Sequence, residues 1–366
     1  MPAPSRAFEP PFCPNPACDF HRQPRGWRYT RKGSFLRKLA PHRIPRYRCS
    51  RCRRSFSSQT FSTTYWLKRP DLLPIVFWRL LGCSALRQIA RELGVSPTTP
   101  LRQMERLGRH ALLFHERLRP KGPPREPLVV DGFESFEGSQ DVPVHFHTAV
   151  GAHSHFVYAF TDSELRRKGR MTPAQRRRRS ARERRLGRPD PRSIEREMAA
   201  LLALVVPAGA AATVRSDAHP AYPRALRRLA GHAALRHEIT SSRAPRTPRN
   251  PLFPANLVDL LIRHSSANHK RETIAFSKRR QSAAERLWLL VVWRNYLKSF
   301  SERRRDDSPA QRLGLLARRL TVADVLRQRL FPTRIRLPER LRPYYWRTTP
   351  TRSIPNPRLH RLKYAF

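Results

Sequence analysis

Apolar positions along this chain follow two periods, which predict helices in one region and strands in the next. Between residues 69 and 118 they recur every three or four positions, in LPIVFWRLLG, LRQIARELG and LRQMERLGRHALLF, and this spacing predicts three helices. After the proline-rich stretch RPKGPPREP come PLVVDGFESF, VPVHFHTAVG and HFVYAFTDSE. These runs are rich in β-branched and aromatic residues, and they predict three successive antiparallel strands.

Helices and strands then alternate. A dense run of arginine at 165–192 interrupts the pattern, and we expect this basic insertion to be partly disordered when free. SIEREMAALLALVV predicts a helix, AATVRSDAHPAY a fourth strand, PRALRRLA a short helix and AALRHEIT a fifth strand. An irregular basic stretch follows, and QSAAERLWLLVVWRNYLKSF predicts a long helix. The expected fold class is therefore multidomain α/β, with flanking helices around a mixed sheet.

These patterns divide the 366 residues into several units, as the length of the chain allows. The expected units are a cysteine-bearing module at 1–66, a helical domain at 67–118, a linker at 119–126, a sheet domain at 127–300 that contains the insertion, and a basic tail at 301–366.

Positive charge dominates the composition. Lys and Arg number 74 against 27 Asp and Glu, a formal net charge of +47, and such a surface requires a polyanionic partner, of which double-stranded DNA is the leading candidate. The longest apolar run, LWLLVVW, is far shorter than the roughly 20 residues that span a bilayer, so no membrane partner is expected. The N-terminus lacks the basic and apolar regions of a secretion signal, and we expect a cytoplasmic protein.

Four cysteines lie in two close pairs near the N-terminus. Cys13 and Cys18 belong to CPNPAC, and Cys49 and Cys52 belong to YRCSRCRRSFSS. Such pairs can surround one structural Zn²⁺, which replaces the core that so small a module cannot build. Two alternatives stay open: His21 could replace one thiolate, or the cysteines could lie unliganded in a loose arm.

The helical domain has the rhythm of a helix-turn-helix. SALRQIARELGVSPTTPLRQMERLGR combines an amphipathic helix, a glycine turn and a second, basic helix. In that arrangement Arg102, Gln103 and Arg106, near the start of the second helix, could reach DNA bases or phosphates. The alternative is an ordinary helical hairpin with a solvated basic face.

Two aspartates end predicted strands. Asp131 ends the first strand and Asp217 the fourth, so both carboxylates emerge at one edge if these strands are neighbours. Carboxylates suit Mg²⁺ or Mn²⁺, and two such ions can promote the cleavage or joining of a phosphodiester. A third acid from a later helix would complete the site, and Glu285 is the candidate, with Asp259 in reserve. Both strand-end aspartates could instead be turn residues.

A basic cluster precedes Glu285. Lys270, Arg271, Lys278 and Arg279 in ANHKRETIAFSKRR could neutralise phosphates beside the metal ions. The alternative is a solvated loop.

These motifs together resemble a known family, the DDE transposases of bacterial insertion sequences, and most closely the insertion sequence one group. The resemblance spans about residues 13–300 and rests on CPNPAC with YRCSRCRRSFSS as a zinc ribbon, LRQIARELGVSPTT as the helix-turn-helix, VVDGFESFEG and VRSDAHPAY as the aspartate strands, and RHSSANHKRETIAFSK before the last helix. It implies a ribonuclease-H-like catalytic domain, catalytic Mg²⁺ or Mn²⁺, binding to the inverted ends of a mobile element, and a homo-oligomer on DNA.

Carried over by residue, Asp131 and Asp217 match the family's two aspartates. The position of the family's glutamate holds Gln281, and Glu285 lies one helical turn further on the same face. Pro100 and the arginine-rich insertion also depart from the simplest members. The expected function is a transposase that cleaves and transfers DNA strands, and the alternative is a non-catalytic DNA-binding regulator or a decayed or domesticated transposase.

Overall fold

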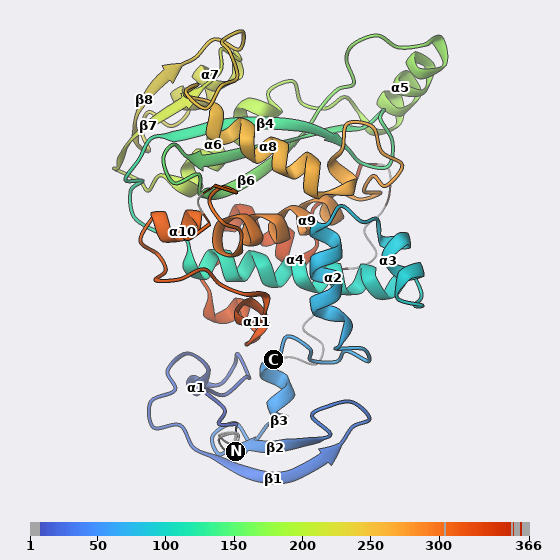
Figure 1. The fold of residues 1–366 in the computed structure, drawn as a ribbon, viewed down its shortest axis with the longest axis vertical. Coiled ribbons are helices and arrows are strands. Elements are labelled where there is room, and N and C mark those ends of the chain that lie inside the picture. Colours follow the sequence, from blue (N-terminus) through green and yellow to red (C-terminus); the bar gives the residue numbers. More distant parts are fainter. Residues whose placement is uncertain (1–7, 304, 353, 355–358, 361–366) are drawn as a thin grey trace.

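A computed structural model describes residues 8–303, 305–352, 354 and 359–360. Its elements form three parts along the long axis: a small N-terminal sheet module, a layer of helices, and a five-stranded sheet with helices on its faces (Figure 1). Residues 1–7 and 361–366, the ends of the first and last predicted units, lie outside the described residues.

The N-terminal module is a three-stranded antiparallel sheet closed by an aromatic cluster. Its elements are α1 (Asp19–Arg22), β1 (Tyr29–Leu36), β2 (Arg43–Cys49), β3 (Ser55–Ser57) and a 3₁₀ turn at Ser58–Phe61. Phe12, Tyr47, Phe56 and Phe61 are buried with three of the cysteines. The mixture of rings and thiols indicates that apolar burial alone does not hold the module together.

Three helices follow, as the apolar period predicts. They are α2 (Leu72–Leu81), α3 (Leu86–Glu92) and α4 (Thr98–Leu118). α4 runs along α9 (Arg280–Val292), and the two approach most closely at Gly108, where a Cβ would lie 2.5 Å from the carbonyl oxygen of Glu285. Within the described chain, no helix combines the length and apolarity needed to cross a membrane.

The large sheet has the order β6-β5-β4-β7-β8. The strands are β4 (Leu128–Phe136), β5 (Pro143–Gly151), β6 (Val157–Glu164), β7 (Ala211–Ser216) and β8 (Ala234–Ile239). β4, β5 and β6 pair antiparallel, whereas β4 pairs parallel with β7, and β7 with β8. The first and fourth strands are therefore neighbours, as the two-aspartate hypothesis requires. Asp217 directly follows β7, but β4 continues to Phe136, so Asp131 lies within its strand and not at the end that the sequence predicted.

One helix lies where the sequence predicted irregular structure. α8 (Phe253–Ser265) packs on β4 and β5 and buries Ala255, Val258 and Ile262, which recur at helical spacing. The other helices beside the sheet, α6 (Ser193–Val205) and α7 (Ala221–Arg227), agree with prediction. α8 was missed because prolines and basic residues flank its short apolar stripe.

The basic insertion contains a regular helix, α5 (Pro173–Leu186), that buries none of its residues. Thr172 caps the helix by accepting a hydrogen bond from the Gln175 backbone N–H, and Pro173 occupies the first turn. Glu183 forms ion pairs with Arg166 and with its neighbour Arg179. Local capping and ion pairs thus account for order in a segment expected to be partly disordered.

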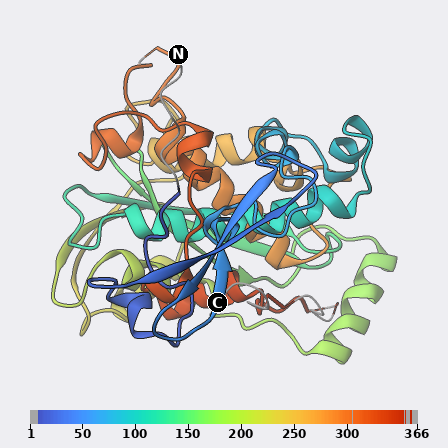
Figure 2. The ribbon, with the colours of Figure 1, turned by 90° about the horizontal axis from the view of Figure 1, so that it is seen from below.

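The C-terminal segment packs across all three parts instead of forming a separate tail. It includes α10 (Pro309–Arg312), α11 (Val322–Leu326) and α12 (Arg342–Trp346). Phe331 enters the aromatic cluster of the N-terminal module. In Figure 2, which is seen from below, the blue strands of this module lie in front of the helical layer. Further along, Tyr344 donates a hydrogen bond to Asp162 of β6, and Arg347 pairs with Glu285 of α9.

The contact between α4 and α9 leads to a stability prediction. Replacing Gly108 by Ala should lower the free energy of unfolding by about 1–3 kcal/mol, because the new methyl group would meet the Glu285 backbone. The matched change Gly122→Ala meets nothing within 4 Å and should be nearly neutral. Urea unfolding followed by fluorescence would measure both, and equal stability of the two variants would contradict the close contact.

Candidate active site and metal centre

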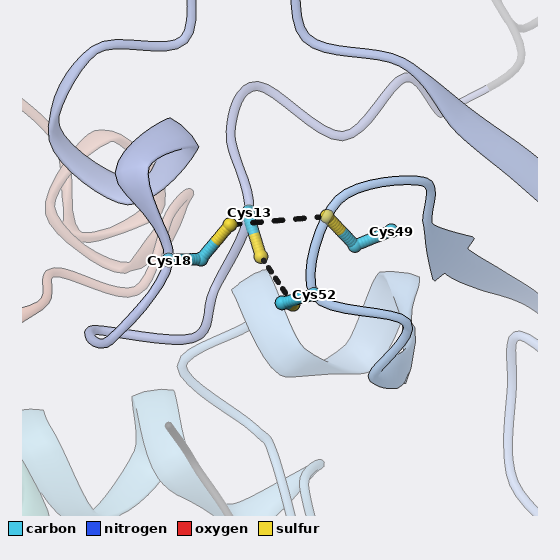
Figure 3. Close-up of side chains that lie close together, drawn as sticks. All are labelled: Cys13, Cys18, Cys49 and Cys52. Carbon is cyan, nitrogen blue, oxygen red and sulfur yellow. Dashed lines mark hydrogen bonds between the residues drawn. The ribbon is translucent and has the colours of Figure 1, made fainter.

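Cys13, Cys18, Cys49 and Cys52 converge in the N-terminal module (Figure 3). Their sulfur atoms all lie within 4.8 Å of one another, with 3.6 Å between Cys13 and Cys52 and 3.9 Å between Cys18 and Cys49. Ligands around tetrahedral zinc, with bonds of about 2.3 Å, are separated by about 3.8 Å. Among the described residues, no other group of three or more His, Cys, Asp or Glu ligands is so close. The cluster could therefore hold zinc.

The surroundings favour ionisation of Cys49, whereas burial raises the pKa of Cys13 and of Cys18. Burial opposes ionisation of Cys49, but hydrogen bonds from the Cys52 backbone and the Trp27 indole, 3.3 Å from the sulfur, lower the pKa of Cys49 to about 7. His21 is buried beside the cluster, and its ring nitrogens bond to the carbonyl oxygen of Cys13 and the hydroxyl of Thr333. The group that could hold zinc consequently consists of the four sulfurs, and His21 is engaged elsewhere.

A second site lies where β7 ends beside the middle of β4. Asp131 on β4, Asp217 just after β7 and Asp259 on α8 all line one pocket of about 800 Å³. Asp131 lies on the face of β4 that α8 covers, so the three acids meet although they are distant in the sequence. The pocket brings both predicted strand-end aspartates together with the reserve candidate Asp259.

The acids are held close enough to perturb one another. Burial, together with the charge of Asp217, raises the pKa of Asp131 to about 6, although the Gly132 backbone N–H donates a hydrogen bond of 2.7 Å to this carboxylate. Burial and the charge of Asp131 raise the pKa of Asp259 well above its ordinary value. One buried oxygen of Asp259, Oδ1, has no hydrogen-bond partner among the described residues. A cation would relieve both the repulsion and this unmet acceptor.

Basic side chains line the same pocket. Lys270 and Arg271 of the predicted basic cluster are exposed there, together with Arg246 and Arg263. Lys278 and Arg279 are not among the lining residues. The acids are thus bordered by cations that could hold phosphate groups.

Glu285 lies elsewhere. Its side chain is 1% exposed, pairs with Arg347 at 2.8 Å, and does not line the pocket. Burial raises the pKa of Glu285 to about 7, against the effect of the arginines beside it. Gln281, one turn earlier, is also buried and donates a hydrogen bond to the Tyr344 carbonyl oxygen. At these positions α9 faces α4 and the C-terminal segment, away from the acid pocket.

Two of the predicted DNA-contacting residues on α4 point inward. Gln103 is 2% exposed and donates to the Arg69 carbonyl oxygen, and Arg106 donates to that of Thr63. Arg102 is exposed. The cause is the segment before α2, whose carbonyl oxygens accept these bonds and which covers the face of α4 opposite the one that meets α9 at Gly108.

The sequence analysis did not select Arg246 and Arg263. A signal for Arg263 was available, because it follows Asp259 by one helical turn and so shares its face once α8 is recognised. Arg246 follows β8 in an irregular segment and had no comparable signal.

Comparisons with known proteins add little. No family model matches the chain, and no match was found among curated proteins. Among solved structures, a chain is matched in the cryo-EM structure of a simian T-cell lymphotropic virus intasome in complex with PP2A regulatory subunit B56 gamma. The identity is 13%, the match covers 65% of this chain and 71% of the other, and the TM-score is 0.27. A score this low does not show a shared fold, and the likeness carries no argument here.

The cysteine cluster predicts the metal content of the purified protein. We expect about one zinc per chain, and Cys52→Ser should lose most of it, because three sulfurs leave a coordination position open. Cys83 lies outside the cluster, so Cys83→Ser should retain the metal. Elemental analysis after dialysis would measure both, and zinc loss in Cys83→Ser alone would contradict the assignment.

Because the pKa of Asp131 is raised, replacing this carboxyl by a neutral amide should increase the stability of the folded protein by an amount that depends on pH. The protonated carboxyl of Asp131 stabilises the folded state at pH values below the pKa that Asp131 has in the unfolded chain. This contribution is lost as the pH rises through about 6, where the carboxyl ionises in the folded protein. Without added divalent ions, Asp131→Asn should therefore be more stable than wild type by about 2 kcal/mol near pH 7.5, and the gain should be small near pH 4.5.

The exposed Asp306 offers a control for this measurement. Asp306→Asn should match wild type at both pH values in urea unfolding. A constant effect of Asp131→Asn across the pH range would contradict the electrostatic origin.

Proposed function

We propose that this protein is a DDE-type DNA transposase, in which Asp131, Asp217 and Asp259 form the catalytic triad. The observation that carries the proposal is the convergence of these three carboxylates in one pocket bordered by basic side chains. The substrate is DNA, and the reaction is metal-dependent cleavage of a strand followed by its transfer to a new site. Asp259 thereby replaces Glu285 as the third acid.

The arrangement of the sheet supports this assignment. A ribonuclease-H-like domain has three antiparallel strands, with a fourth strand parallel to the first and a fifth parallel to the fourth, which agrees with the order β6-β5-β4-β7-β8. Its third acid comes from a helix after the fifth strand, and α8 follows β8. The acids come from the first strand, the end of the fourth, and this helix.

The acids fit divalent cations of the Mg²⁺ or Mn²⁺ class. Such ions prefer carboxylate oxygens, and the unpartnered Oδ1 of Asp259 is one such donor. A pair of bound ions would activate the attacking oxygen and stabilise the leaving one. The acids do not all lie within 4.8 Å of one another, a spacing that suits two ions better than one. Lys270, Arg271 and Arg263 hold the phosphates of the strand beside them.

The remaining units serve to bind DNA and assemble on it. The zinc module and the helical domain recognise the inverted ends of the mobile element, and among the predicted α4 contacts the exposed Arg102 is the one available to DNA. Lys278 and Arg279 follow the lining residues Lys270 and Arg271 in the sequence, and they extend the basic stretch before α9. The active form is a homo-oligomer on the DNA.

Cleavage of DNA carrying the inverted repeats beside the coding sequence tests the triad. With Mn²⁺, Asp131→Asn, Asp217→Asn and Asp259→Asn should each lower the cleavage rate by more than about 100-fold, because each removes metal-binding oxygen. Glu285→Gln is the matched control, and it should retain cleavage because its carboxylate lies outside the pocket. Gel analysis of nicked products gives the rates.

Each alternative has its own outcome. If Asp259→Asn still cleaves DNA and a folded Glu285→Gln does not, the third catalytic acid is Glu285. A wild-type protein that binds the repeats and never cuts them would favour a non-catalytic regulator.

A further inference from the structure

The basic insertion places an arginine-rich helix beside the acid pocket. Residues 165–192 contain thirteen Lys and Arg residues against two acids, and α5 carries seven of the arginines. In Figure 1 this helix stands apart from the stacked layers, at one end of the large sheet. A 14-residue helix that buries no side chain does not stabilise the fold by apolar packing, so its exposed charge needs another explanation.

A groove joins α5 to the acid pocket. A second cavity, of about 460 Å³, lies between α5, the turn after β4 and the loop before α9. Gln175, Arg178 and Arg182 of α5 line this cavity on one side. Phe136 and Gln140 line both cavities, so the acid pocket and the α5 cavity adjoin at these two residues.

Two acidic residues hold the basic insertion, residues 165–192, in place, and we call this insertion the arm. Asp141, in the turn after β4, accepts from Arg167 at 2.7 Å and from Arg178 at 3.0 Å. Glu183 pairs with Arg166 and Arg188. These contacts hold one face of α5 toward the groove. Within the part of the chain that the structure describes, Arg178 and Arg179 are the α5 arginines that pair with an acid.

The two faces of α5 differ in what they meet. Arg182 and Arg185 lie three residues apart, on the face that includes the lining residues, and Nη1 of Arg182 is buried with no hydrogen-bond partner among the described residues. Arg176 and Arg184 are exposed on the opposite face. The unmet donor of Arg182 therefore points to an anionic partner within the groove.

We infer that the groove face of α5 binds the phosphate backbone of duplex DNA as the duplex leaves the acid pocket. This inference rests on the proposed function, and it adds the path of the DNA. Phosphates are the anions that fit, because a groove lined by successive arginines matches a regularly spaced line of negative charge. The arm holds one side of the duplex while Lys270 and Arg271 border the other cavity.

The salt dependence of DNA binding tests the groove face. Binding of a fluorescein-labelled duplex of arbitrary sequence is followed by anisotropy from about 0.05 to 0.3 M KCl, with Ca²⁺ in place of Mn²⁺ to prevent cleavage. The double variant Arg182→Gln with Arg185→Gln should lower the slope of log affinity against log salt by about 2, and weaken binding more than about tenfold at 0.1 M. The matched variant Arg176→Gln with Arg184→Gln should change the slope by less than about half as much.

The controls separate contact from folding and from catalysis. The corresponding Lys variants at 182 and 185 should restore the slope, since a point charge displaces the same counterions. Equal slopes for the two Gln pairs, or an unchanged slope in the groove pair, would overturn the inference. The measurement needs no cleavage, so failure of the triad would leave its result intact, and failure of the arm would leave the triad standing.

Discussion

The parallel pairing of β4 with β7 is the constraint on which the acid pocket depends. Val129 pairs with Arg215, and two residues further along each strand brings the chain to Asp131 and Asp217. No local pattern could bring these acids together, because two strands, the arginine-rich insertion and α6 separate them. The pairing also has a cost, since the charge of Asp217 adds to burial in raising the pKa of Asp131. A fold that keeps such repulsion in place is pre-organised for a cation.

The helices α8 and α9 have different roles beside the large sheet. α9 begins at Arg280, a buried guanidinium that pairs with Glu137, Asp162 and Glu164 from β6 and the turn after β4. This network, with the pair of Glu285 and Arg347, fixes α9 as a packing element between α4 and the sheet. α8 has the same length but packs on β4 and β5, and its polar face lines the pocket. An acid on α9 therefore balances buried arginine, whereas the acid on α8 faces the cavity.

Sequence reasoning succeeded where the signal was local. The strands at Asp131 and Asp217 have β-branched runs with polar residues beside them. The cysteine pairs have short spacings that can be recognised in the sequence whatever the fold of the rest of the chain. It failed where long-range packing decides. Whether Gln103 faces solvent depends on the segment before α2, where the Arg69 carbonyl oxygen accepts its hydrogen bond. Whether Glu285 faces an edge depends on Arg347, which lies in the segment expected to be a tail. Asp259 was named only in reserve because its helix was not recognised.

The C-terminal segment links the cysteine-bearing N-terminal module to the large sheet. Phe331 packs among the aromatic rings beside the cysteines, and Thr333 bonds to His21, which in turn bonds to the Cys13 carbonyl oxygen. The same segment then reaches Asp162 through Tyr344. Phe331 and Tyr344 thus contact two different parts of the fold, the N-terminal module and the large sheet. A short length of chain connects these two parts. The C-terminal segment thereby connects the N-terminal module to the sheet that carries the acid pocket.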